Sequence, residues 1–147
     1  MTRYRFFVFT CPTSLPFSLF NHSWVVIIKD DEIFRWEVLF RKGSDNTHLH
    51  CNHYLPFSGV EVFLPIKKVY WKAKLIYYLE GESAKKIHSL VKRSQDLYFL
   101  KNKYSLVGPN CNTYVQWILN NFPDLNMRLP RSCIGRDYNI KKDVNKS

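Results

Sequence analysis

The sequence predicts one α+β domain, in which an antiparallel sheet of about five strands packs against helices. Two apolar runs, residues 22–28 (HSWVVII) and 32–40 (EIFRWEVLF), flank the polar turn 29–31 and predict a β-hairpin. Later in the chain, apolar residues recur at helical spacing over 82–98 and again over 111–121. Strands that gather before the helices are typical of the α+β class.

The remaining elements are less distinct. Further short strands are expected over 5–10, 60–64 and 74–79, and polar loops over 11–21 and 41–58. The domain is expected to span 1–138, and the polar segment 139–147 is expected to form a tail that frays.

Composition excludes several classes of protein. The 147 residues are 46% hydrophobic and 16% aromatic, which argues against a disordered chain. No apolar run approaches the ~20 residues of a membrane helix, so no transmembrane segment is expected. The first twenty residues are interrupted by Pro12 and Pro16 and resemble no signal peptide. We therefore expect a cytoplasmic protein, with signal-independent secretion as a bacterial effector left open.

The net charge of +10 predicts an acidic substrate or surface, such as a lipid, peptidoglycan or an acidic protein. The four cysteines are widely spaced and form no Cys-x-x-Cys pair, so neither disulfides nor a zinc ribbon are expected. No cofactor is expected either.

Cys111 is the candidate nucleophile. It follows Gly108-Pro109-Asn110, where Asn110 is a suitable N-cap for the helix that begins at Cys111. The positive end of a helix favours the reactive thiolate, and its free N–H groups can stabilise an oxyanion. A half-buried structural cysteine is the alternative.

His22 and Glu37 complete a candidate triad. His22 opens the 22–28 strand, and a tight turn around Asp30 would place Glu37 roughly opposite it on the return strand. The alternatives are a hydrogen-bonded histidine at a strand end and an outward-facing glutamate paired with Arg35 or a lysine. The strand register decides between them, because a slip of one residue turns Glu37 to the other face.

The segment 48–53 (HLHCNH) offers metal-ligand types, but six residues without a second cluster are a weak match, and no metal site is expected. His48 or His50 could instead cover a cleft or replace Glu37 as third catalytic residue. Substrate contacts are expected from residues around the candidate triad: Asn110, Asn112, Trp24, His48 and His50.

Four segments in order, HSWVVI, RWEV, GPNCNTYVQWIL and LPRSCIGRDY, resemble an uncharacterised bacterial family. Its hallmark is Gly-Pro-Asn-(Ser or Cys)-Asn-Thr, followed by Leu-Pro and Ile-Gly-x-Asp-Tyr. The His-first, Cys-later order also resembles circularly permuted papain-like hydrolases, the group that includes NlpC-type peptidases and lecithin:retinol acyltransferase. Many members of the Gly-Pro-Asn family have Ser at the position of Cys111, which leaves the generality of thiol chemistry open.

The resemblance implies a permuted papain-like fold and a Cys111–His22–Glu37 hydrolase or acyltransferase that acts on an amide or ester. It leaves the roles of Gly135, Arg136 and Asp137 open, including a bracing role for the Cys111 helix. The alternative is a non-catalytic basic module that binds anionic lipid, nucleic acid or a partner protein. The residues that favour this alternative are Lys67, Lys68, Tyr70, Trp71, Lys72 and Lys74.

Overall fold

A five-stranded antiparallel sheet forms the centre of the molecule. The computed structural model describes residues 1–13, 20–62 and 64–144. The strand order is β4-β3-β2-β1-β7, and a separate two-stranded sheet pairs β5 with β6. The strands are β1 (Tyr4–Pro12), β2 (Asn21–Lys29), β3 (Glu32–Val38), β4 (Leu49–Cys51), β5 (Ser58–Val62), β6 (Val69–Lys72) and β7 (Lys74–Glu80).

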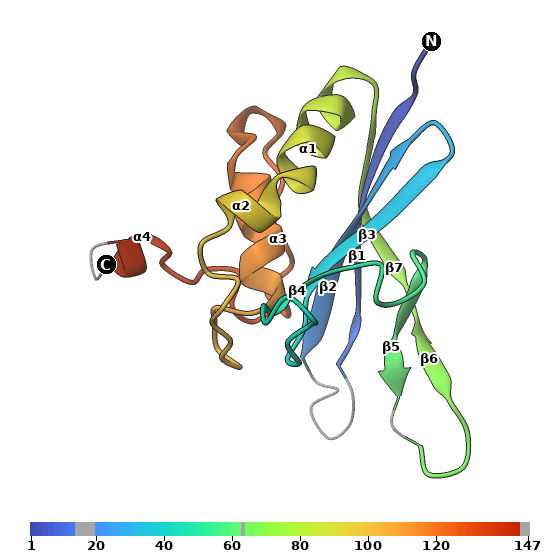
Figure 1. The fold of residues 1–147 in the computed structure, drawn as a ribbon, viewed down its shortest axis with the longest axis vertical. Helices are drawn as coiled ribbons and strands as arrows, with labels where there is room; N and C mark the ends of the chain where they lie inside the picture. Colours follow the sequence, from blue (N-terminus) through green and yellow to red (C-terminus); the bar gives the residue numbers. More distant parts are fainter. Residues whose placement is uncertain (14–19, 63, 145–147) are drawn as a thin grey trace.

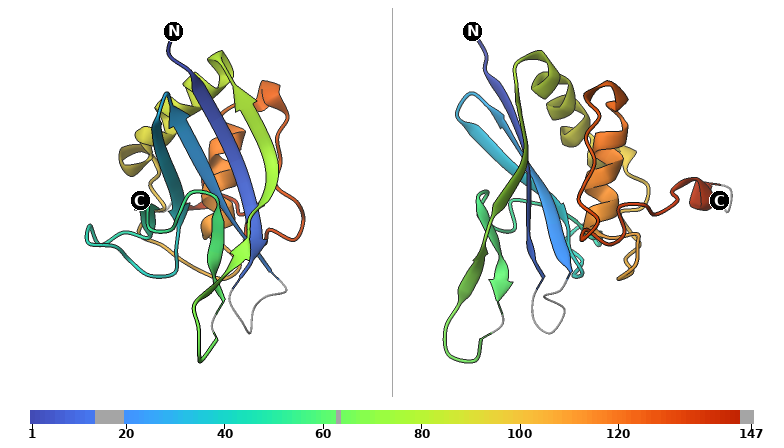
Figure 2. Two further views of the ribbon diagram at one scale, coloured as in Figure 1. Left: turned by 90° about the vertical axis from the view of Figure 1, so that its right-hand side faces the viewer. Right: turned by 180° about the vertical axis from the view of Figure 1, so that it is seen from behind.

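The helices lie on one side of the sheet and the β5–β6 pair on the other (Figures 1 and 2). The helical elements are α1 (Glu82–Lys92), α2 (Ser94–Leu97), α3 (Cys111–Asn120), the 3-10 turn η1 (Pro123–Leu125) and α4 (Lys141–Val144). This arrangement confirms the predicted α+β class and the five-stranded antiparallel sheet. None of the helices in the described part of the chain combines the length and hydrophobicity that a membrane span requires.

Two apolar clusters stabilise the two faces of the sheet, because successive side chains of a strand point to opposite faces. The larger cluster packs Val25 and Ile27 of β2 against α1 and α3. The smaller cluster packs Trp24 and Val26 of the same strand against Val60 of β5. β2 is therefore buried on both faces, which explains its continuous apolar sequence.

The predicted helix over 82–98 is in fact two helices, so its predicted extent was wrong. The chain turns at Arg93, between α1 and α2. Buried Ser94 donates a 2.6 Å hydrogen bond to the Val91 carbonyl and lies 2.9 Å from the Tyr114 hydroxyl. A contact with α3 thus shapes this turn, and the spacing of apolar residues along 82–98 cannot reveal it.

Other boundaries also differ from the sequence prediction. β1 continues through Cys11 into the predicted loop 11–21, whereas β3 ends at Val38. β4 lies inside the predicted loop 41–58, and α4 occupies part of the tail that was expected to fray. Most of the predicted loop 11–21 (residues 14–19) and the tail end at 145–147 lie outside the described residues.

Candidate active site

The first turn of α3 places Cys111 against the sheet. Asn110 caps this helix, since its side-chain oxygen accepts hydrogen bonds from the N–H groups of Asn112 (3.0 Å) and Thr113 (3.3 Å). The Thr113 hydroxyl in turn accepts from the Asn110 N–H, which completes a capping box. Cys111 itself is 6% exposed. The helix start is therefore fixed by local hydrogen bonds, and its thiol is almost covered.

Asn112 ties this helix start to the start of β2. Its side-chain oxygen accepts a 2.7 Å hydrogen bond from the Ser23 hydroxyl, and its Nδ2 donates to the Asn21 carbonyl at 2.8 Å. Ser23 and Asn21 flank His22 in the sequence. These two bonds hold the first residues of α3 and β2 side by side, although 89 positions separate Ser23 from Asn112.

The structure brings His22 together with both proposed partners. The imidazole interacts electrostatically with the Cys111 side chain, whose negative charge favours the protonated ring. Its Nε2 lies 3.7 Å from Glu37 Oε1, an ion-pair distance that is too long for a good hydrogen bond. The ring also stacks on Trp24, with the two centroids 5.8 Å apart. His22 therefore stands between a thiol and a carboxylate.

The charges of these groups favour a protonated imidazole. Burial is the largest effect and lowers the pKa of His22, but the negative charge and hydrogen bonding of Cys111, reinforced by Glu37, raise it to about 10. Burial likewise acts to raise the pKa of Glu37, but His22 and then Arg35 hold it below its usual range. An imidazolium near a carboxylate is the state this environment stabilises at neutral pH.

Arg35 fixes the carboxylate of Glu37. Its Nε and Nη2 both donate to the two Glu37 oxygens, and the guanidinium lies 4.1 Å from the centre of the Trp24 ring. Its Nη1 donates to the carbonyls of Leu55 at 2.7 Å and Ser58 at 2.5 Å. Arg35 is 0% exposed and Glu37 is 1% exposed, so this is a buried and well-partnered ion pair.

The strand register gives Glu37 its place. Val25 pairs with Trp36, and continuing this register sets Glu37 across from Trp24 and diagonal to His22. The sequence prediction of a position roughly opposite His22 was off by two residues. Because side chains of a strand alternate between the two faces, a register difference of two residues leaves Glu37 on the same face of the sheet as His22. The two side chains can therefore still pair. The sequence offered pairing of Glu37 with Arg35 as an alternative to pairing with His22. In the structure, Glu37 contacts both residues.

The five predicted substrate-binding residues are engaged within the protein. Asn110 and Asn112 form the hydrogen bonds described above, and Trp24 is fully buried with its Nε1 donating to the Pro56 carbonyl at 3.0 Å. His48 Nδ1 lies 2.9 Å from the main-chain carbonyl of Leu39, and His50 Nε2 lies 2.7 Å from that of Arg41. The contact with His22 is made by Glu37.

Across residues 1–13, 20–62 and 64–144, no group of three or more His, Cys, Asp or Glu side chains is arranged to hold a metal ion. The rings of His50 and His53 lie 5.1 Å apart, but they gather no third ligand of this kind.

The C-terminal motif 134–138 braces the start of α3. The Ile134 carbonyl accepts hydrogen bonds from the side-chain amides of Asn110 (3.0 Å) and Asn112 (2.8 Å), and the Gly135 carbonyl accepts from the Thr113 hydroxyl (2.8 Å). Arg136 pairs with Asp137 at 3.2 Å. The sequence left the role of Gly135 open, and its contact with Thr113 supports a role in bracing the start of α3.

Gly135→Ala is expected to lower the free energy of unfolding by about 2–4 kcal/mol, through backbone strain and loss of the Asn110 cap. Gly135 has φ +96°, and an added Cβ would lie 2.4 Å from Asn110 Oδ1. Gly81→Ala is the control, because Gly81 also has a positive φ of +74° but an added Cβ there would meet nothing within 4 Å, so a loss of about 1 kcal/mol is expected. Urea denaturation measures both. Equal losses would show that the close approach to Asn110 does not matter.

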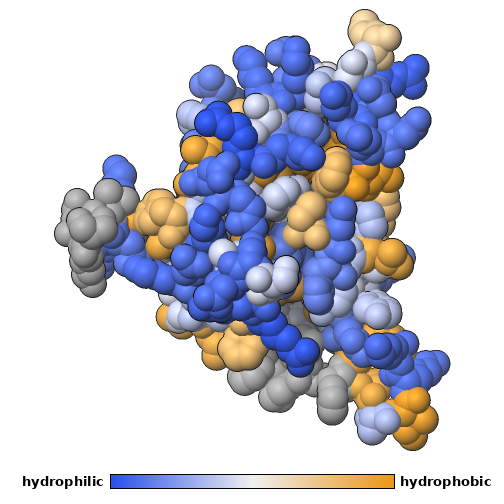
Figure 3. Space-filling view, viewed as in Figure 1, coloured by the Kyte–Doolittle hydropathy of each residue, from blue (hydrophilic) through white to orange (hydrophobic). Residues whose placement is uncertain are grey.

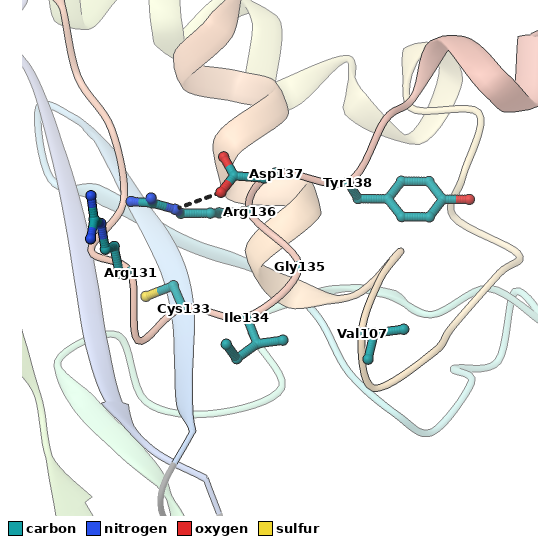
Figure 4. A pocket seen from close by; sticks show the side chains of 8 residues that line it. All are labelled: Val107, Arg131, Cys133, Ile134, Gly135, Arg136, Asp137 and Tyr138. Atoms are coloured by element: carbon teal, nitrogen blue, oxygen red, sulfur yellow. Dashed lines mark hydrogen bonds and ion pairs between the residues drawn. The ribbon is translucent and has the colours of Figure 1, made fainter.

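A cavity of about 600 Å³ lies beside this motif (Figure 4). Arg131, Cys133 and Arg136 lie on the side nearer the sheet, and Val107 and Tyr138 lie on the other side (Figure 4). Burial and then the nearby Cys111 raise the pKa of Cys133 to about 12. The cavity carries two arginines, of which Arg136 pairs with Asp137 in the same lining.

Two neighbours of the site were not predicted from the sequence. Cys11 pairs directly with His22 across β1 and β2 and accepts a 3.5 Å contact from the Val60 N–H. Burial raises the pKa of its thiol. Arg35 was considered only as a surface partner of Glu37. Cys11 sits in no motif, and Arg35, although it belongs to the RWEV segment, shows its buried role only through its contacts in the folded chain.

The fold and the site together define an α+β domain with a buried thiol–imidazole–carboxylate cluster at the first turn of a helix. The chain belongs to the family described as "Protein of unknown function (DUF3750)", whose model matches residues 7–138. That range contains His22, Glu37, Cys111 and the C-terminal motif. No curated protein and no solved structure shows significant similarity to the chain.

Proposed function

We propose that the protein is a thiol hydrolase or acyltransferase that acts on an amide or ester through Cys111, His22 and Glu37. The observation that carries the proposal is the position of His22, which lies 3.7 Å from Glu37 on a strand start that Asn112 hydrogen-bonds to the first turn of α3, and which interacts electrostatically with Cys111. A nucleophile, a base and a residue that orients the base, in mutual reach, are the parts that covalent acyl transfer requires. The chain order His22, Glu37, Cys111 also supports a permuted papain-like relationship.

In the proposed reaction, the Cys111 thiolate attacks the substrate carbonyl carbon and forms a carbon–sulfur bond. The carbon–nitrogen or carbon–oxygen bond to the leaving group then breaks, and protonated His22 donates its proton to that group. A thioester on Cys111 results. Water, deprotonated by His22, hydrolyses it to the free acid, or a second nucleophile accepts the acyl group in the same way. Either route restores the thiolate and the imidazolium.

The start of α3 supplies a donor for the oxyanion. Asn110 already engages the N–H groups of Asn112 and Thr113 through its side chain, and that of Tyr114 through its carbonyl at 3.1 Å. The N–H of Cys111 is the first-turn donor left for the substrate oxygen. The helix dipole adds to the same stabilisation.

Glu37 and Arg35 act on His22 rather than on the substrate. The carboxylate attracts the Nε2 side of the imidazole, while Arg35 prevents the carboxylate from rotating. The 3.7 Å separation leaves room for this contact to tighten when substrate binds. For the substrate, the arginines in the neighbouring cavity and the net charge of +10 favour an acidic molecule.

The chain contains its own control for a labelling experiment. Cys51 is exposed, whereas Cys111 is buried. Exposure alone therefore predicts that iodoacetamide labels Cys51 first, and activation by His22 predicts that limiting reagent labels Cys111 first. Peptide mass mapping of the alkylated full-length protein distinguishes the two. We expect Cys111 to be labelled preferentially, and His22→Gln to reverse the preference.

The acyl-transfer step needs a separate test with an activated ester. We expect p-nitrophenyl acetate to leave one acetyl group on Cys111, with release of p-nitrophenolate, and Cys111→Ala to lose this burst. Cys51→Ala is the matched variant and should retain it. Preferential labelling of Cys51 together with the absence of an acetyl group on Cys111 would overturn the proposal.

A further inference from the structure

The β5–β6 hairpin projects beyond the five-stranded sheet as an arm (Figure 1). Its base is anchored: Val60 is buried in the smaller apolar cluster, and Trp71 donates to the Thr13 carbonyl at 3.3 Å. Its far end is different. Ile66 is 94% exposed there and Leu64 is 45% exposed, and Tyr70 of β6, one residue before Trp71, is 46% exposed. Single exposed apolar residues are common, but two at one projecting tip, with an exposed tyrosine on the same arm, mark an interaction surface.

Lysines surround these apolar side chains. Lys67, Lys68 and Lys72 of the arm are exposed, as is Lys74 at the start of β7, and Glu61 is the acidic residue of the arm. With Lys74 included, the five charges sum to +3. In the space-filling view, the arm at the lower right shows apolar atoms at its end with strongly hydrophilic residues beside them (Figure 3). The arm thus carries exposed apolar side chains at its tip and exposed lysines next to them.

We propose that the β5–β6 arm docks the protein on the surface of an anionic lipid bilayer. Leu64 and Ile66 enter the boundary between headgroups and acyl chains, and the ammonium groups of Lys67, Lys68 and Lys72 bind lipid phosphates around them. Tyr70 is suited to the same interface, since its ring is apolar and its hydroxyl polar. The lysines could also bind the phosphates of a nucleic acid, but that contact would not bury the side chain of Ile66, which is 94% exposed.

The arm projects toward the end of the molecule at which β2 and α3 begin (Figure 1). Docking through the tip therefore turns the end that carries His22 and Cys111 toward the membrane. The lipid contact itself needs neither of these side chains. It would hold for a protein without catalytic activity, and for an enzyme it would bring the site near substrates at the membrane.

Vesicle co-sedimentation of the full-length protein tests the proposal. We expect binding to phosphatidylcholine vesicles that contain phosphatidylglycerol, little binding to phosphatidylcholine alone, and weakening by added salt. Each lysine at an anionic surface contributes about fivefold in affinity. The double substitution K67E/K68E should therefore weaken binding at least about 25-fold, and Ile66→Ser should weaken it without any change of charge.

K85E/K86E is the matched control, because it alters net charge equally on the exposed face of α1. Equal weakening by the two double variants, unchanged binding by Ile66→Ser, or no binding to anionic vesicles would each overturn the proposal. So would tip-dependent binding of an oligonucleotide, or tip-dependent self-association, in the absence of vesicle binding. Cys111→Ala is expected to bind vesicles like the unaltered protein, so a failure of the proposed chemistry is distinguishable.

Discussion

Arg35→Met is expected to lower the free energy of unfolding by about 3–5 kcal/mol, because it leaves the Glu37 carboxylate buried beside an incomplete set of partners. The substitution removes both guanidinium bonds to Glu37 and the bonds to the carbonyls of Leu55 and Ser58. Those carbonyls belong to the segment that leads into the β5–β6 arm. Urea denaturation followed by far-ultraviolet circular dichroism measures the loss without relying on Trp24 fluorescence.

Two further variants compare the stability contribution of this buried ion pair with that of an exposed ion pair. Adding Glu37→Leu to Arg35→Met removes the unpaired carboxylate, so part of the lost stability should return. The rest should stay lost, because the carbonyls of Leu55 and Ser58 still lack the guanidinium and His22 loses its carboxylate partner. Arg128→Met breaks an exposed pair with Asp137, whose side chains are 64% and 60% exposed, and should cost no more than about 1 kcal/mol. If Arg35→Met costs no more than Arg128→Met, the pair does not stabilise the fold in the way described.

The sheet and its main helices were predictable because their patterns are long. β2 and β3 are nine and seven residues in length, and α3 has ten. β4 and β6 have three and four residues, too few for a period to be recognised against the background of loop sequence. The break between α1 and α2 depends on Ser94 and Tyr114, which meet only in the folded chain.

The candidate site was predictable to a similar degree. Cys111 after Asn110 and His22 at a strand start are recognisable by local chemistry alone. The alternation of β3 places Ile33, Arg35 and Glu37 on one face, and two charged residues on a face normally indicate solvent. The carbonyls of Leu55 and Ser58 accept hydrogen bonds from Arg35 on that face, so its burial depends on a tertiary contact. No spacing within β3 reveals this contact.

The reactivity of Cys111 should depend on His22 most strongly in mild acid. At pH 6, we expect His22→Gln to slow alkylation of Cys111 by iodoacetamide about 100-fold, because the substitution removes the group that takes the thiol proton. The difference should shrink toward pH 10, where any thiol ionises without help. Iodoacetamide is uncharged, so lost electrostatic attraction does not explain the effect. Mass mapping at several pH values gives the two rates.

The pH range in which charged His22 and charged Glu37 coexist follows from the shifts of their pKa values. The pKa of His22 is raised to about 10. The contribution of the protonated imidazole to folding stability is therefore complete below its ordinary pKa of 6.5 and is lost as pH rises through about 10. The pKa of Glu37 is lowered, so its contribution holds above the ordinary carboxyl range and is lost as pH falls below that range. Between these limits imidazolium and carboxylate coexist beside the thiol. Labelling of Cys111 that rises with pH in parallel with Cys51, and is unchanged by His22→Gln, would show that the pair does not activate the sulfur.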